Sequence, residues 1–317
     1  MRHKNQLIAV SSCLLFLALS TLDGSIGPAQ GGLSNKPVRF TVTDPSGNPI
    51  RDATVEASRH GPGNAIGNTD PDGEVILQLT REVSLHVNVS SDGYYDSGGL
   101  LWSAGHYMGP DNRLLPRELP DRFTVQLKPV LDPVELHRGR FRGTVPNSSR
   151  PLGFDLVANA WVHPFGSGSV TDIYFHFQDM LVSENEYRGT LTVSFPNPRD
   201  GIQPFTAPRP FSSAFGSNLA PPNRAPVSGY QPALSFSVST SRQSAPAPDR
   251  NYLLRTRSRT DAAGYLRQAC YGWIQGEIEF DPRGPDGPQL QFSYTFNADP
   301  DPSARSLESL EDVPMKP

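Results

Sequence analysis

The sequence contains little cysteine, and this limits what can hold the fold together. The 317 residues include 2 cysteines, Cys13 and Cys270. Cys13 lies in an N-terminal apolar run that we expect to be removed, so Cys270 remains alone and can form no internal disulfide. Stability must therefore come from packed apolar cores, which a chain of this length can bury. Cys270 itself lies in a strand-like run and is expected to be a small buried hydrophobe rather than a nucleophile.

Charge is also sparse and unclustered. The chain has 28 Lys+Arg and 32 Asp+Glu, a formal net charge of −4. No basic cluster of the size that binds nucleic acid is present, so we expect no nucleic-acid partner. Arg255, Arg257 and Arg259 alternate and should share one face of a strand. A solvated strand face is favoured over an anion site for these three arginines.

Long apolar runs are absent beyond the N-terminus. A short basic stretch at 1–5 precedes the apolar run 7–22, and small residues follow up to Ala29. This order is typical of a secretory signal peptide over 1–29, which predicts a secreted, periplasmic or cell-surface protein. The alternative is an N-terminal membrane anchor, but the run is shorter than the roughly 20 residues that a spanning helix needs. No membrane span is expected in the mature chain.

Proline and glycine are abundant, with 32 and 28 residues, and this argues against long helices. Apolar residues recur instead at every second position, between turn sequences rich in Asp, Pro, Ser and Gly. In the first part these runs are 38–42, 53–57, 74–79, 83–89 and 123–127. In the second part they are 141–145, 153–162, 172–181, 188–195, 251–260, 269–280 and 290–296. The pattern predicts an all-β protein with an Ig-like sandwich over 37–128 and a larger, jelly-roll-like β-sandwich over 129–297.

Two segments interrupt this strand pattern. The stretch 196–232 is rich in proline but also holds several phenylalanines, so we interpret it as an extended loop that lies over a sheet. The tail 298–317 is polar and is predicted to be disordered.

Three motifs in the first part carry a family resemblance. The stretches VTDPSGNPIRDATVEAS (42–58), NTDPDGEVIL (68–77) and VSLHVNVSSDGYYD (83–96) follow one another in order. Together they resemble the carboxypeptidase regulatory-like domain, and the resemblance implies an Ig-like sandwich similar to transthyretin. It implies no activity, because the catalytic zinc domain of carboxypeptidases is absent. The second part is similar to secreted proteins of planctomycete and verrucomicrobial bacteria, and that likeness implies no activity either.

One turn offers a candidate metal site. Asn68, Asp70 and Asp72 match the first half of a calcium-binding loop. The twelfth position of such a loop should be Glu, but here it is Leu79. Because the turn alone also explains the pattern, a plain β-turn is favoured over a calcium site. The sequence predicts no cofactor.

Aromatic residues form the best candidate binding site. The sequence gathers several aromatic residues in and before a long polar connection: Tyr94, Tyr95, Trp102, His106 and Tyr107, with Asp96, Asp111 and Asn112 as polar neighbours. Aromatic faces stack on the C–H groups of sugars, and polar neighbours bind the hydroxyls. A loop anchor is favoured over a binding site for Trp102 and Tyr107, which would pin the long loop to its own sandwich. A polysaccharide or another envelope protein is the expected partner.

No catalytic motif is found. The closest match to a nucleophile elbow, LWSAG at 101–105, lacks the first glycine. The histidines show no paired metal-ligand spacing. The sequence therefore predicts a secreted, non-enzymatic binding or structural module of the cell envelope or extracellular space that binds carbohydrate. The alternatives are an extracellular hydrolase with a carboxylate or histidine site in the second domain, and a scaffold that binds no glycan.

Overall fold

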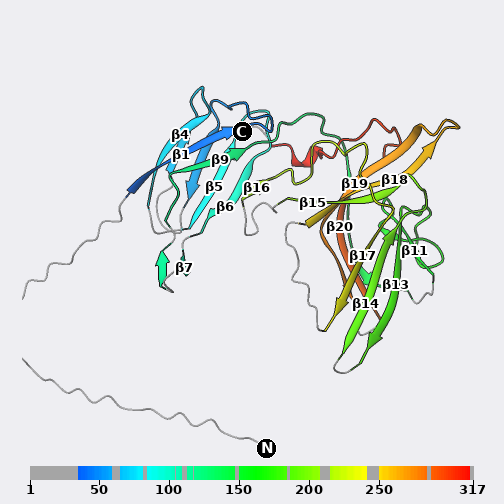
Figure 1. Cartoon of the computed structure of the whole chain (residues 1–317). Coiled ribbons are helices and arrows are strands. Elements are labelled where there is room, and N and C mark those ends of the chain that lie inside the picture. Colours follow the sequence, from blue (N-terminus) through cyan, green and yellow to red (C-terminus); the bar gives the residue numbers. More distant parts are fainter. Residues whose placement is uncertain are drawn as a thin grey trace, which may run out of the picture. The chain divides into compact units, whose positions relative to one another are not determined.

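The fold consists almost entirely of β-strands (Figure 1). The computed structural model describes residues 35–58, 65–80, 84–103, 105–108, 113–116, 118–146, 150–183, 186–207, 215–240, 250–283 and 287–314. The predicted signal peptide lies outside these residues. No helix in the described ranges is long and apolar enough to cross a membrane. The prediction of an all-β fold is confirmed.

The first sandwich has two sheets. The smaller sheet has the order β4-β1-β9 and the larger has the order β16-β6-β5-β2-β3. Their strands are β1 (Asn35–Thr43), β2 (Thr54–Ser58), β3 (Ala65–Asn68), β4 (Glu74–Thr80), β5 (Leu85–Ser90), β6 (Ser97–Trp102), β9 (Arg122–Gln126) and β16 (Gly216–Ser217). A separate hairpin pairs β7 (His106–Met108) with β8 (Leu114–Pro116). Strand β1 runs antiparallel to β4 and parallel to β9.

Alternation along these strands builds the first core. Val38, Phe40 and Val42 of β1 are fully buried, as are Val55 of β2 and Val89 of β5. All five belong to one apolar cluster between the two sheets. The period-two pattern of the sequence therefore identified the inward faces correctly.

The chain reverses its direction in the turn after β1, and two residues of this turn explain why. The Asp44 carboxylate accepts hydrogen bonds from the amides of Ser46 (2.8 Å) and Asn48 (2.9 Å). Gly47 has a φ of 85°, which side chains other than hydrogen rarely tolerate. The chain then returns to pair Thr43 with Pro49.

The second sandwich has two five-stranded sheets, with the orders β10-β20-β19-β18-β15 and β12-β11-β13-β14-β17. Their strands are β10 (His137–Thr144), β11 (Leu152–Asp155), β12 (Ala160–Trp161), β13 (Ile173–Val182), β14 (Tyr187–Ser194), β15 (Gly201–Thr206), β17 (Ala233–Ser239), β18 (Arg250–Thr260), β19 (Leu266–Asp281) and β20 (Gln289–Asn297). The core between the sheets is aromatic: the ring of Phe154 packs against Phe141, Trp161, Phe175 and Phe292.

The outer face of β18 and β19 carries a further apolar layer. Leu253, Tyr271 and Trp273 are buried there beneath Ala225 and Leu307. Both residues of this cover come from segments outside the sandwich strands. The first sheet of this sandwich is therefore covered on both faces over part of its width.

The prediction for 196–232 was incomplete. This stretch is not only a covering loop, because it contributes β15 to the second sandwich and β16 to the first. It is also held by Lys128, whose ammonium donates to the carbonyls of Leu219 (2.9 Å), Ala220 (3.2 Å) and Pro221 (2.9 Å). The sequence pattern missed both strands, because each is short and lies at the edge of a sheet, where proline is tolerated.

The prediction of a disordered tail over 298–317 was wrong for 298–314. Leu307, Glu308 and Ser309 are buried, and a 3₁₀ turn, η1, spans Leu310–Asp312. The Glu308 carboxylate accepts hydrogen bonds from the Tyr95 hydroxyl (3.1 Å) and the Leu131 amide (2.8 Å). A buried carboxylate that finds such partners can order a polar segment that has no apolar pattern of its own.

The expectation of a solvated arginine face on β18 was also wrong. A bulge follows Thr256, and Arg257 has a φ of 54°, so the alternation is broken there. Arg257 instead donates from Nε (2.7 Å) and Nη2 (2.8 Å) to the two oxygens of Asp172, whose side chain is 0% exposed. Arg255 donates to the carbonyls of Arg199 and Val227. These arginines hold the second sandwich together.

Candidate functional site

The first candidate site is a pocket of about 900 Å³ that loops at the end of the first sandwich form. The loop between β1 and β2 supplies one wall and the loop after β5 supplies another. Its lining residues are Pro49, Ile50, Arg51, Asp52, Thr54, Ser90, Ser91, Asp92, Gly93, Tyr94, Asp96, Val130, Val313 and Pro314. Loops at the end of a sandwich are free to carry binding residues, because the sheets hold their ends in place.

Tyr94 supplies the aromatic part of this pocket. It is half-buried and packs against the first core. Backbone bonds fix its position: the Tyr94 amide donates to the Ser91 carbonyl (3.1 Å), and the Val130 amide donates to the Gly93 carbonyl (2.8 Å). The pocket therefore has one ring on a rigid backbone.

The Asp96 carboxylate can accept hydrogen bonds, but no donor among the described residues contacts it. Its side chain is half-buried, and burial raises the pKa of its carboxyl above the ordinary value. Within the described part of the chain, this carboxylate has no hydrogen-bond or ion-pair partner. A carboxylate in a pocket wall with no donor from the described residues can accept hydrogen bonds from a ligand.

The other predicted aromatic residues do not join Tyr94 in the pocket. Tyr95 is 0% exposed, and its hydroxyl bonds Glu308, so including it in an exposed binding platform was wrong. Trp102 lies on β6, opposite Leu85, and packs against the first core, as the alternative of a loop anchor requires. His106 and Tyr107 lie in β7, but their side chains are outside the described residues, so their role stays a prediction.

The predicted metal ligands form a tight turn. The Asp70 carboxylate accepts hydrogen bonds from the amides of Asp72 (3.0 Å) and Glu74 (2.9 Å). Asn68, Asp70 and Asp72 are all exposed. No group of three His, Cys, Asp or Glu side chains that could hold a metal is found in the described ranges. The turn geometry explains these residues, and the calcium site stays a prediction.

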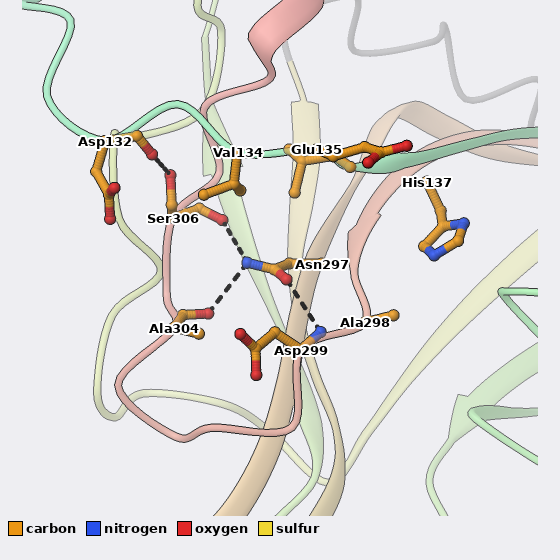
Figure 2. A pocket seen from close by; sticks show the side chains of 10 residues that line it. Asp132, Val134, Glu135, His137, Asn297, Ala298, Asp299, Ala304 and Ser306 are labelled. Atoms are coloured by element: carbon orange, nitrogen blue, oxygen red, sulfur yellow. Dashed lines mark hydrogen bonds between the residues drawn. The ribbon is translucent and has the colours of Figure 1, made fainter.

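A second candidate site is a groove of about 540 Å³ in the second sandwich (Figure 2). The segment that leads into β10 supplies Asp132, Glu135 and His137, and Asp299 follows β20. Its remaining lining residues are Val134, Leu136, Asn297, Ala298, Ala304 and Ser306.

Asn297 organises this groove (Figure 2). Its side-chain amide donates to the carbonyls of Ala304 (3.2 Å) and Ser306 (3.3 Å), and its oxygen accepts from the Asp299 amide (3.1 Å). Sequence reasoning missed the groove because its two walls are more than 150 residues apart in the chain. The strand pairing of β10 with β20 and the bridge between Val134 and Ser309 bring them together.

Comparisons with known proteins identify no family. No protein-family model matches the sequence, and a search of curated proteins finds no match. One similar solved structure is catechol 1,2-dioxygenase from Acinetobacter sp. ADP1, inhibited by bound mercury, at 12% identity and a TM-score of 0.24. That match covers 32% of this chain and 55% of the dioxygenase, so the chain spans about half of the dioxygenase's length.

Another similar structure comes from Bacteroides uniformis ATCC 8492 and is described as a candidate carbohydrate binding protein. It is 9% identical with a TM-score of 0.19, and the match covers 83% of this chain and 99% of that one. Neither likeness is close enough to carry an argument about function.

Proposed function

We propose that the chain is a secreted, non-enzymatic module that binds carbohydrate in the pocket of Tyr94 and Asp96. The observation that carries the proposal is the half-buried, unpartnered carboxylate of Asp96 in the same pocket wall as a fixed aromatic ring. A sugar offers both complements, since its C–H face stacks on a ring and its hydroxyls donate to a carboxylate.

Other lining residues suit the same ligand. Thr54, Ser90 and Ser91 bring hydroxyl groups to the pocket. Arg51 is more than two-thirds exposed there and pairs with Asp52 through Nε at 3.0 Å. Groups that both donate and accept can follow the hydroxyls of a sugar ring around its edge. A pocket of this size takes one or a few sugar units rather than a flat polymer surface.

The motifs described above support a carboxypeptidase regulatory-like identity for this sandwich. The N-terminal sequence 1–29 supports export to the envelope or beyond. Loops at the end of the sandwich can bind a ligand without disturbing the fold, because the two sheets hold the core together.

The test is binding of the mature chain, from Gln30 on, to a glycan array. Asp96→Asn keeps the shape of the side chain but removes its charge, and we expect affinity for the selected glycan to fall about tenfold. The same change should raise the melting temperature of the free protein, because it removes an unpartnered carboxylate. Glu118→Gln, an exposed carboxylate of the same sandwich, is the matched control and should change neither quantity.

Two results would contradict this proposal. One is an array with no specific glycan; the other is binding that Asp96→Asn and Tyr94→Ala leave unchanged while both variants melt cooperatively. Repeating the array with a chelator tests the Asn68, Asp70 and Asp72 prediction separately.

A hydrolase is the second candidate function, and the groove in Figure 2 favours it. Glycoside hydrolysis needs one carboxyl group as acid and another as base or nucleophile across the scissile bond. Glu135 and Asp299 both line the groove, as does His137. We would incubate the mature chain with polysaccharides and look for new reducing ends. Activity that Glu135→Gln and Asp299→Asn each abolish would establish the enzyme, and the absence of any product would refute it.

A further inference from the structure

The outer face of β10 carries a row of arginines. Along this strand Phe141 points inward, where its ring contacts Phe154 and Phe292. Arg138, Arg140 and Arg142 therefore point to the opposite face, and all three are exposed. With a rise of about 3.4 Å per residue, successive arginines on this face lie about 7 Å apart.

Neighbouring strands continue the row as a polar sheet surface. Strand β10 is an edge strand, and its only ladder partner among the described strands is β20. The register places Arg140 beside Ser293 and Arg142 beside Gln291. One strand further, Gln275 on β19 lies beside Ser293. Residues opposite one another in a ladder share a face, so the guanidinium groups stand next to hydroxyl and amide groups.

The row already binds carboxylates of this chain. Arg138 donates from Nη2 to Asp312 (2.5 Å) and lies 3.2 Å from Glu311 through Nε, both in the turn η1. Arg140 and Arg142 have the same orientation, but their guanidinium groups have no partner within the described residues. On this face Arg138 is therefore paired with acidic groups, and Arg140 and Arg142 are unpaired within the described residues.

We propose that this face binds an extended acidic polysaccharide. Its carboxylates would pair with the forked donors of Arg140 and Arg142, and its hydroxyls would bond Ser293, Gln291 and Gln275. This surface lies on the second sandwich and takes a different ligand from the Tyr94 pocket, so the inference does not depend on the proposed function. Arginine suits this ligand because its planar fork matches a carboxylate in two parallel hydrogen bonds.

Two features favour a polysaccharide over nucleic acid. The row has no exposed aromatic ring on which a base could stack. Isolated arginines with the exposed carboxylate of Glu279 beside Gln291 suit a ligand with spaced charges better than duplex DNA, which carries about one charge per 1.7 Å. A uronic-acid polymer carries fewer charges along its length and many hydroxyls, which fits a mixed polar surface better.

A simpler explanation is that the arginines protect the edge strand. Charged side chains on an edge prevent pairing with another sheet. Lysine protects an edge equally well, but it lacks the planar fork. Arg140→Lys/Arg142→Lys therefore separates the two explanations, because it keeps the charge and removes the bidentate geometry.

The experiment measures binding of the mature chain to polygalacturonate oligosaccharides by titration calorimetry. We expect Arg140→Gln/Arg142→Gln to weaken binding at least about tenfold, and the lysine double variant to fall between it and the original chain. Arg122→Gln/Arg259→Gln removes two exposed arginines elsewhere and should bind normally. Asp96→Asn should also bind normally, which keeps this test independent of the pocket.

Several outcomes would overturn the inference. They are no binding to polygalacturonate, equal binding by the glutamine double variant, and binding of duplex DNA at least as tight as that of polygalacturonate. A fourth is equal affinity of the lysine variant, since the arginines would then act only as charges. Melting temperatures of the arginine variants should match that of the original chain, which would show that the fold is intact.

Discussion

The two sandwiches use different means to hold two sheets together. The first core is mainly aliphatic, built on Val38, Val42 and Val55, and the one ring stacked on Phe40 among the described residues is Phe123. The second core is built on clustered rings around Phe154, and a buried ion pair between Asp172 and Arg257 lies at its edge. The comparison shows that one alternating sequence pattern can produce both kinds of core. It also shows where substitutions should matter most.

The largest difference in unfolding free energy between the two sandwiches should come from one arginine substitution in each. Arg257→Ala would leave the fully buried Asp172 carboxylate without its ion-pair partner, and we expect a loss of about 3–5 kcal/mol in the free energy of unfolding. Arg39→Ala removes an exposed pair with Glu74 in the first sandwich and should cost less than about 1 kcal/mol. Urea unfolding of both variants measures the difference. Equal losses would show that the buried pair is not what distinguishes the second sandwich.

A smaller difference is expected for two phenylalanines. Phe154 and Phe40 are both fully buried, but within the described residues Phe154 contacts four other rings and Phe40 contacts one. Each ring pair contributes about 0.5–1.5 kcal/mol beyond the area it buries. Phe154→Leu should therefore destabilise the protein by roughly 2 kcal/mol more than Phe40→Leu. Thermal unfolding monitored by calorimetry would test this, and a smaller loss for Phe154 would contradict the ring-cluster explanation.

The smallest effect concerns reactivity rather than stability. Cys270 is buried in the second core, and burial raises the pKa of its thiol to about 11. The thiolate is the reactive form, so at pH 8 a thiol reagent should label the folded mature chain only when the second sandwich opens. Labelling should then speed up in Arg257→Ala and stay unchanged in Arg39→Ala. Rapid labelling of the native chain would show that Cys270 is accessible without opening.

Local patterns in the sequence were enough to predict the longer strands of both sandwiches. They missed β3, β6, β7, β8, β15, β16 and β17. Period-two alternation located β1, β13 and β20, and Asp44 with Gly47 predicted the first turn. The Ig-like and carboxypeptidase regulatory-like assignments stay predictions. Local patterns failed where order depends on distant partners. Glu308 is buried and accepts hydrogen bonds from Tyr95 and Leu131. No residue near Glu308 in the sequence indicates these bonds.

The candidate sites were harder to predict than the fold. Tyr94 and Asp96 were in the predicted cluster, but the sequence could not show that Tyr95 points inward while its neighbour lines a pocket. The arginine row on β10 was hidden because its charges are separated by glycine and phenylalanine, and no basic cluster appears in the linear sequence. Only the pairing with β20 turns these residues into a surface.

The bond between Tyr95 and Glu308 joins residues 213 positions apart in the chain. During synthesis the first sandwich can pair its strands before Glu308 emerges. The Tyr95 hydroxyl and the Leu131 amide gain this hydrogen-bond acceptor only after Glu308 has been synthesised. Folding therefore ends with the docking of a late segment onto a structure formed earlier, and a chain truncated before Glu308 would leave Tyr95 and Leu131 without this acceptor.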